Sequence, residues 1–80
     1  MQYEKQMSLT HRYRGHTVYL KFYWMKPNDS VPAAVHIVDA SDVSGFGITA
    51  AELGGKWPDY QSSLAEAVGA ANRFIDSQLG

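Results

Sequence analysis

Two stretches near the N-terminus alternate apolar and polar side chains, which is the period of a β-strand with one buried face. The apolar positions are Met7, Leu9 and Tyr13 in residues 7–13, and Val18, Leu20, Phe22 and Trp24 in residues 16–25. Between the two stretches, Arg14-Gly15 suits a two-residue turn, because glycine adopts positive φ without strain. The pattern therefore predicts a β-hairpin.

The turn also predicts the register of this hairpin. It sets the following residues opposite one another: Tyr13 and His16, His11 and Val18, Leu9 and Leu20, Met7 and Phe22. Directly paired residues share a face of the sheet, so the apolar side chains of both strands fall on one side. A slip by one residue would place Leu9 and Leu20 on opposite sides. The turn and the alternation thus agree on one register.

The rest of the chain predicts two further strands and a helix. Residues 33–40 form a strand with Val35 and Ile37 facing inward, and residues 46–53 form another, although residues 50–53 would also suit a helical turn. A helix follows over residues 63–79, where Ser63 and Glu66 have the spacing of a capping box. Its apolar stripe consists of Leu64, Ala67, Val68, Ala71, Phe74, Ile75 and Leu79.

These elements predict an α+β fold in one domain, residues 1–80, with an antiparallel sheet of three to four strands and one C-terminal helix packed on one face. A helix of this length covers much of one face of a four-stranded sheet and nothing of the other. The second face must therefore be exposed or covered by another molecule.

Composition narrows the class of protein. The chain of 80 residues is 45% apolar and 19% charged, as globular proteins are. It has no cysteine, which excludes disulfides and thiolate metal sites. No apolar run approaches the roughly 20 residues that span a bilayer, and the N-terminus lacks the apolar core of a signal peptide. We therefore expect a cytoplasmic protein that does not bind membranes.

Charge is unevenly distributed along the chain. Residues 1–26 carry five Lys or Arg and one Glu, a sum of +4, whereas residues 27–80 sum to −5. The hairpin register places Arg12, Tyr19, Lys21 and Tyr23 on the face away from the helix. Such a surface suits a protein partner or self-association, because tyrosine is enriched at interfaces. The alternative is single-stranded nucleic acid, whose bases stack on tyrosines while cations bind phosphates. Tyrosine is also common on exposed strands without any such role.

No catalytic or metal-binding motif is present. His11, His16 and His36 lack ligand spacing, and Asp39 and Asp42 resemble only a fragment of a calcium loop. The glycines of the SGFG sequence at residues 44–47 do not extend to a phosphate-binding loop. Trp57 and Tyr60, in the loop before the helix, suit packing over the sheet edge or a small contact patch. We expect no cofactor and no enzymatic activity.

The C-terminal third, with WPDY followed by SLAEAVGAANRFID, resembles the N-terminal domain of the HicB antitoxin family. The similarity covers Pro58-Asp59 and the Glu66-Ala67 pair at the start of the helix. The glycine-rich run of that family before the helix is absent, and no separate DNA-binding region follows. The resemblance implies a small bacterial domain with strands that lead into a helix.

Overall fold

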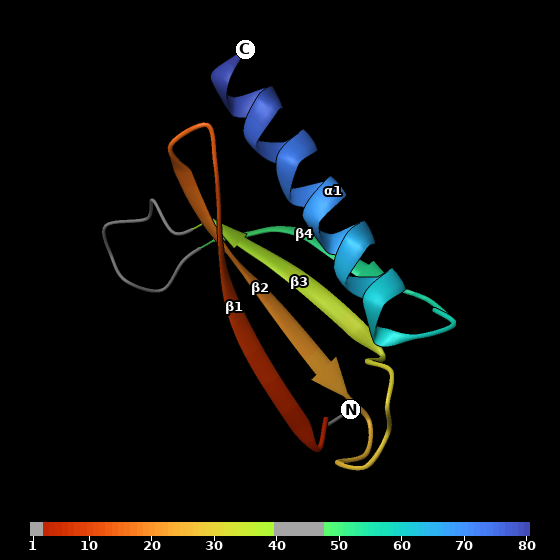
Figure 1. Ribbon diagram of the computed structural model, residues 1–80. Coiled ribbons are helices and arrows are strands. Elements are labelled where there is room, and N and C mark those ends of the chain that lie inside the picture. Colours follow the sequence, from red (N-terminus) through yellow and green to blue (C-terminus); the bar gives the residue numbers. More distant parts are fainter. Residues whose placement is uncertain (1–2, 40–47) are drawn as a thin grey trace.

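A computed structural model describes residues 3–39 and 48–80 of the chain. Four strands precede one helix: β1 (Lys5–Tyr13), β2 (His16–Trp24), β3 (Ala34–Asp39), β4 (Ile48–Gly54) and α1 (Tyr60–Leu79). The strands form one antiparallel sheet in the order β1-β2-β3-β4, and α1 lies across one face of it (Figure 1). The predicted α+β fold is confirmed.

The hairpin has the predicted turn and register. Arg14 and Gly15 both have positive φ, 53° and 79°, as the inner residues of a type I′ turn do. Tyr13 pairs with His16 and Leu9 pairs with Leu20, and the pairing continues to Lys5 and Trp24. β1 thus begins two residues earlier than predicted, at Lys5, and β2 ends one residue earlier, at Trp24.

The second half of the sheet also follows its alternation. Val35 and Ile37 are fully buried on the helix side, as predicted. β3 begins one residue later than expected, at Ala34, and the pairing of β3 with β4 shifts register between Ile37 and Val38. β4 extends one residue further than expected, to Gly54. The expected ends at Ala40 and Phe46, and the turn at residues 41–45, lie outside the described residues.

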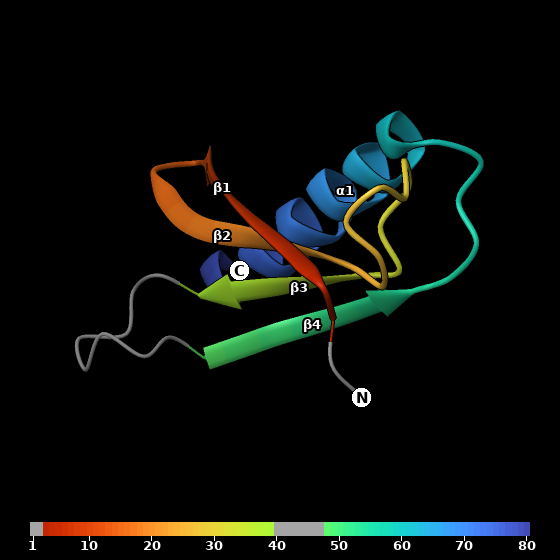
Figure 2. The same ribbon diagram turned by 90° about the horizontal axis from the view of Figure 1, so that it is seen from below.

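The core lies between the inner sheet face and one side of α1 (Figure 2). The sheet contributes the buried side chains Val18, Leu20, Phe22, Trp24, Val35 and Ile37. The helix contributes mainly small residues, Ala67, Ala70 and Ala71, together with Ile75. Small side chains let the helix approach the sheet closely, so the large sheet side chains fill the space between the two layers.

The helix begins earlier than the sequence predicted. Asp59, not Ser63, is the N-cap, and its carboxylate accepts a 2.7 Å hydrogen bond from the backbone N–H of Ser62. Ser63 lies inside the first turn, fully buried, and its hydroxyl donates to the carbonyl of Tyr60. Glu66 accepts a hydrogen bond from the indole N–H of Trp57. The capping-box prediction was therefore wrong, because an aspartate four residues upstream already caps the helix.

The predicted helical stripe is correct at its centre and wrong at its end. Ala67, Ala71 and Ile75 are fully buried, whereas Phe74 is only half-buried and its ring meets that of His16 edge-on at 6.4 Å. Leu79 is 48% exposed. Leu79, in the last turn of α1, therefore does not belong to the buried stripe.

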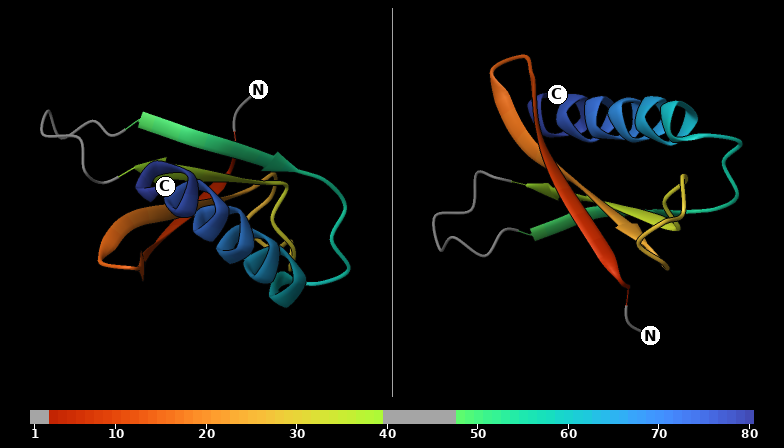
Figure 3. Two further views of the ribbon diagram at one scale, coloured as in Figure 1. Left: turned by 90° about the horizontal axis from the view of Figure 1, so that it is seen from above. Right: turned by 60° about the horizontal axis from the view of Figure 1, so that its bottom comes forward.

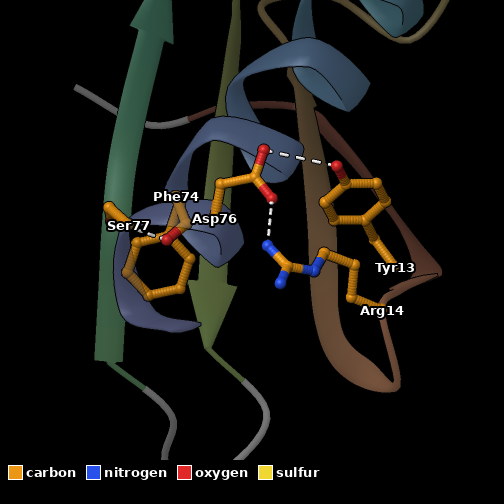
Figure 4. Close-up of polar contacts among 5 residues, drawn as sticks. All are labelled: Tyr13, Arg14, Phe74, Asp76 and Ser77. Atoms are coloured by element: carbon orange, nitrogen blue, oxygen red, sulfur yellow. Dashed lines mark hydrogen bonds and ion pairs between the residues drawn. The ribbon is translucent and has the colours of Figure 1, made fainter. Parts of the chain in front are cut away.

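Polar contacts join the hairpin tip to the C-terminal half of the helix. Asp76 of α1 accepts hydrogen bonds from the Tyr13 hydroxyl, at 3.3 Å, and from the Arg14 guanidinium, at 2.8 Å (Figure 4). Deeper in the same region, His11 Nε2 lies 2.8 Å from Asn72 Oδ1. The hairpin curls toward the helix at this end (Figure 3). The polar contacts therefore hold the hairpin tip against the C-terminal half of α1.

The Asp59 cap predicts a specific pH dependence. Hydrogen bonds from Ser62 lower the pKa of Asp59, so the charged cap stabilises the fold above the ordinary aspartate pKa. That stabilisation is lost as the pH falls through the depressed pKa of the folded state. An asparagine at this position would cap the helix without titrating. On acidification, the melting temperature of wild type should therefore fall more than that of the Asp59→Asn variant.

Two further variants control this experiment. Asp59→Ala should lower the melting temperature at neutral pH, since it leaves an amide of the first turn without its acceptor. Ser63→Ala should change it little, because the Ser63 hydroxyl is a donor to a carbonyl and caps nothing. A constant difference between wild type and Asp59→Asn at all pH values would contradict the assignment of Asp59 as the titrating cap.

Candidate functional site

Among residues 3–39 and 48–80, no helix covers the sheet face opposite α1 (Figure 3). We call it the outer face. Strand alternation and the observed register define its residues, which are Gln6, Ser8, Thr10 and Arg12 of β1, Thr17, Tyr19, Lys21 and Tyr23 of β2, Ala34, His36 and Val38 of β3, and Glu52 of β4. These side chains form rows across the sheet, because directly paired residues share a face.

The structure brings all four predicted site residues onto this outer face. Tyr19, Lys21 and Tyr23 occupy successive outward positions of β2, and Arg12 lies on β1 opposite Thr17, one row beyond Tyr19. The row of Arg12 and the row of Tyr23 are about 20 Å apart along the strands, at roughly 3.4 Å per residue. The four residues therefore form a line along the hairpin and not a compact cluster.

The two tyrosines of β2 have different environments. The ring of Tyr23 lies between two other rings, 5.1 Å from Tyr3 and 4.6 Å from His36, centroid to centroid. Tyr23 is half-buried as a result. Tyr19 has no ring partner among the described residues and is 40% exposed. Of the predicted pair, Tyr19 is thus the side chain that offers an open aromatic surface.

The cations beside Tyr19 have no acidic partner among the described residues. Within residues 3–39 and 48–80, neither Arg12 nor Lys21 forms an ion pair. Arg12 is exposed and Lys21 is half-buried. Lys21 lies opposite His36, which in turn lies opposite Glu52, so one row of the outer face runs from a cation to a carboxylate. The outer face is therefore mixed in charge, with its positive end at Arg12.

Sequence reasoning missed two residues of the outer face, His36 and Glu52, and Tyr3, whose ring lies against Tyr23 of that face. Tyr3 precedes the predicted first strand, His36 was considered only as a metal ligand, and Glu52 was not considered. The pairing of β2 with β3 brings His36 beside Tyr23 and Lys21. The sequence contains one indication for His36: it alternates with the inward residues Val35 and Ile37, which places its side chain on the outward side of the strand. Its register against β2 could not be derived, because a loop and not a two-residue turn joins these strands.

A hollow opens at the start of β1. Its volume is about 280 Å³, and it is lined by Tyr3, Glu4, Lys5, Gln6 and Tyr23. The Lys5 ammonium lies 4.7 Å from the centre of the Trp24 ring, so it is already held by a cation–π contact. Glu4 is exposed and has no ion-pair partner in the described part of the chain. The hollow thus combines tyrosine rings with an unpaired carboxylate.

The other candidate residues have structural partners. His16 lies 3.1 Å from Asp39 on the inner side of the sheet, and His11 contacts Asn72. The three histidines thus lie in separate places, and among the described residues no three metal-ligating side chains form a cluster. Tyr60 packs on Phe22, with ring centroids 5.4 Å apart, and Trp57 packs against the core. Asp42 and the SGFG sequence lie outside the described residues.

No helix in the described part of the chain has the length and apolar character needed to cross a bilayer.

The ring contacts of Tyr23 predict a difference between two like substitutions. Tyr19→Ala and Tyr23→Ala both remove a tyrosine from the outward side of β2. Only Tyr23→Ala removes two ring contacts, so it should reduce the free energy of unfolding by about 1–2 kcal/mol more than Tyr19→Ala does. Denaturant unfolding measures both values. Tyr23→Phe, which keeps the ring, should be close to wild type, and equal losses for the two alanine variants would contradict the different environments described above.

No protein-family model matches the chain, and no curated protein or solved structure matches it significantly.

Proposed function

We propose that this chain is a non-enzymatic interaction module that binds a protein partner through its outer face. The observation that carries the proposal is the position of Tyr19, an exposed aromatic side chain between Arg12 and Lys21. In the part of the chain that the structure describes, neither cation has an ion-pair partner and no helix covers this face. Tyrosine and arginine are among the residue types most enriched at binding hot spots, and both anchor a partner once water is displaced.

The charges favour a partner of particular chemistry. Arg12 lies in the row on one side of Tyr19, and Lys21 lies in the row on the other side. A partner that complements this surface would therefore present an apolar side chain to Tyr19 and carboxylates to the two cations. A second copy of the chain is a poor match at this position. Two outer faces laid against each other would bring like charges together around the tyrosines. The centre of the outer face therefore suits an acidic segment of a different protein.

Single-stranded nucleic acid is the alternative ligand of the same face, and the contacts favour it less. Tyr23 already has a ring neighbour on each side, which leaves Tyr19 as the one open ring of β2 for base stacking. The HicB resemblance remains a prediction; a toxin encoded beside this chain would be the first partner to test.

Peptide display tests the proposed function directly. Peptides selected on the immobilised wild-type protein should carry Asp or Glu next to an apolar side chain. Their dissociation constants should rise by roughly tenfold or more with Tyr19→Ala and with Lys21→Glu, as expected for interface anchors. Two exposed residues away from the outer face, Leu79 and Lys56, provide matched controls. Leu79→Ala and Lys56→Glu should leave the affinities unchanged.

A parallel titration with labelled single-stranded oligonucleotides separates the two ligand classes. Salt-sensitive binding of the oligonucleotide that is reduced by Tyr19→Ala would favour the nucleic-acid alternative. If, in addition, no peptide is selected, the result would contradict the protein-binding proposal. Peptides that bind Tyr19→Ala as tightly as wild type would also contradict it. Circular dichroism of each variant confirms that the fold is retained.

A further inference from the structure

β1 is an edge of the sheet, and half of its backbone groups face away from β2. Residues that flank a two-residue hairpin turn form a hydrogen-bonded pair, and such pairs alternate along the strands. Tyr13 flanks the turn, so the odd-numbered residues of β1 bond to β2. Consistent with this, the carbonyl of Trp24, the partner of Lys5, points toward β1 and accepts a hydrogen bond from Glu4 N–H at 3.0 Å. The N–H and C=O groups of the even-numbered residues 6–12 therefore face the open edge.

The middle of this edge lacks the usual protection against pairing. β1 is nine residues long, contains no proline, and pairs with β2 without a register shift. Natural sheets block such edges with prolines, bulges, short strands or charged side chains, and the two charged residues of β1, Lys5 and Arg12, lie near its ends. At the middle of β1 the outward side chains are short, Ser8 and Thr10, and the inward side chains Met7 and Leu9 are only half-buried. The edge is thus open to another strand and has apolar surface beside it.

We propose that the β1 strands of two copies of this chain pair antiparallel about a two-fold axis at Leu9, which joins the two sheets into one. This register uses all nine residues of the strand, from Lys5 opposite Tyr13 to Leu9 opposite Leu9. It sets the edge-facing residues opposite each other, Gln6 with Arg12 and Ser8 with Thr10. These pairs make the new hydrogen bonds, and no like charges stand opposite one another.

The hollow at the start of β1 supplies a site for the second copy. Gln6 lines the hollow, and in the proposed register Arg12 of the second copy lies opposite Gln6 on the outer face. Its guanidinium then reaches the carboxylate of Glu4 and the rings of Tyr3 and Tyr23. Arg12 and Glu4 have no ion-pair partners within the described chain. In the dimer, Arg12 of each copy pairs with Glu4 of the other, so the two-fold axis produces two identical ion pairs.

The inner side gains contact in the same arrangement. Leu9 meets Leu9 across the axis, and Met7 meets His11 of the second copy. Met7 and Leu9 pack against the core but are not covered completely, and β1 is the margin of the sheet. Strand pairing would cover this margin with apolar surface. The inference does not rest on the proposed function: Arg12 is engaged by the second copy in the dimer, whereas Tyr19 and Lys21, which the peptide experiment tests, stay uncovered.

Cysteine crosslinking tests the register, because the chain has no thiol of its own. Residues opposite themselves at a non-hydrogen-bonded position have Cα atoms about 4.5 Å apart, which a disulfide can bridge. Leu9→Cys should therefore form a covalent dimer on mild oxidation. Met7→Cys, on the same strand and face, lies two positions from the axis and should not. Equal crosslinking of both variants, or of neither, would overturn the proposed register.

Sedimentation of the unmodified protein at several concentrations tests the association itself. Wild type should show a monomer–dimer equilibrium, and Arg12→Glu should weaken it by roughly tenfold or more through loss of the Arg12–Glu4 pairs. Glu4→Arg combined with Arg12→Glu should restore the dimer. A wild type that stays monomeric, or a dimer insensitive to both changes, would overturn the proposal. Tyr19→Ala should leave dimerisation intact while it weakens peptide binding, so the failure of either proposal can be recognised separately.

Discussion

The packing of one helix against one face of the sheet is the constraint on which the rest of the structure depends. α1 presents Ala67, Ala71 and Ile75 to the inner side chains of β2 and β3, and all three are fully buried. With small residues on the helix, the two layers come close enough for Phe22 and Ile37 to fill the interior. No second helix is present in the described part of the chain to cover the outer face. Tyr19 on that face is therefore exposed, although Ala34 and Val38 of the same face are buried.

The polar contacts at the hairpin end follow from the same constraint. The apolar contacts of the helix end near Ile75, and beyond it the chain uses ion pairs and hydrogen bonds instead. Asp76 accepts hydrogen bonds from the Tyr13 hydroxyl and the Arg14 guanidinium, and His16 lies beside Asp39. Exposed ion pairs such as Arg14–Asp76 contribute little to stability individually. Their effect is to fix the curl of the hairpin toward the helix, which sets the direction of β1 and of its open edge.

The hairpin and the fold class could be predicted from the sequence because local rules determine them. Alternation in both strands and a two-residue turn leave only one register that places Leu9 and Leu20 together. The start of the helix could not be chosen as safely, because Asp59 and Ser63 are both good capping residues and the Glu66 spacing favoured the wrong one. The exposure of Leu79 depends on where the sheet ends beneath the helix. Likewise, the burial of Tyr23 depends on Tyr3 and His36, which reach it only through tertiary pairing.

The central claim is that the sheet is covered on one face only, and thiol reactivity tests it most directly. Thr10→Cys and Val18→Cys are nearly isosteric changes on neighbouring strands, one on the outer face and one in the core. At low protein concentration, the thiol of the Thr10→Cys variant should react with a thiol reagent at the rate of a free cysteine. The thiol of the Val18→Cys variant should react more slowly by a factor on the order of a thousand or more, because it is exposed only when the domain opens. Equal protection of the two thiols would show that the outer face is covered as well and would contradict the account.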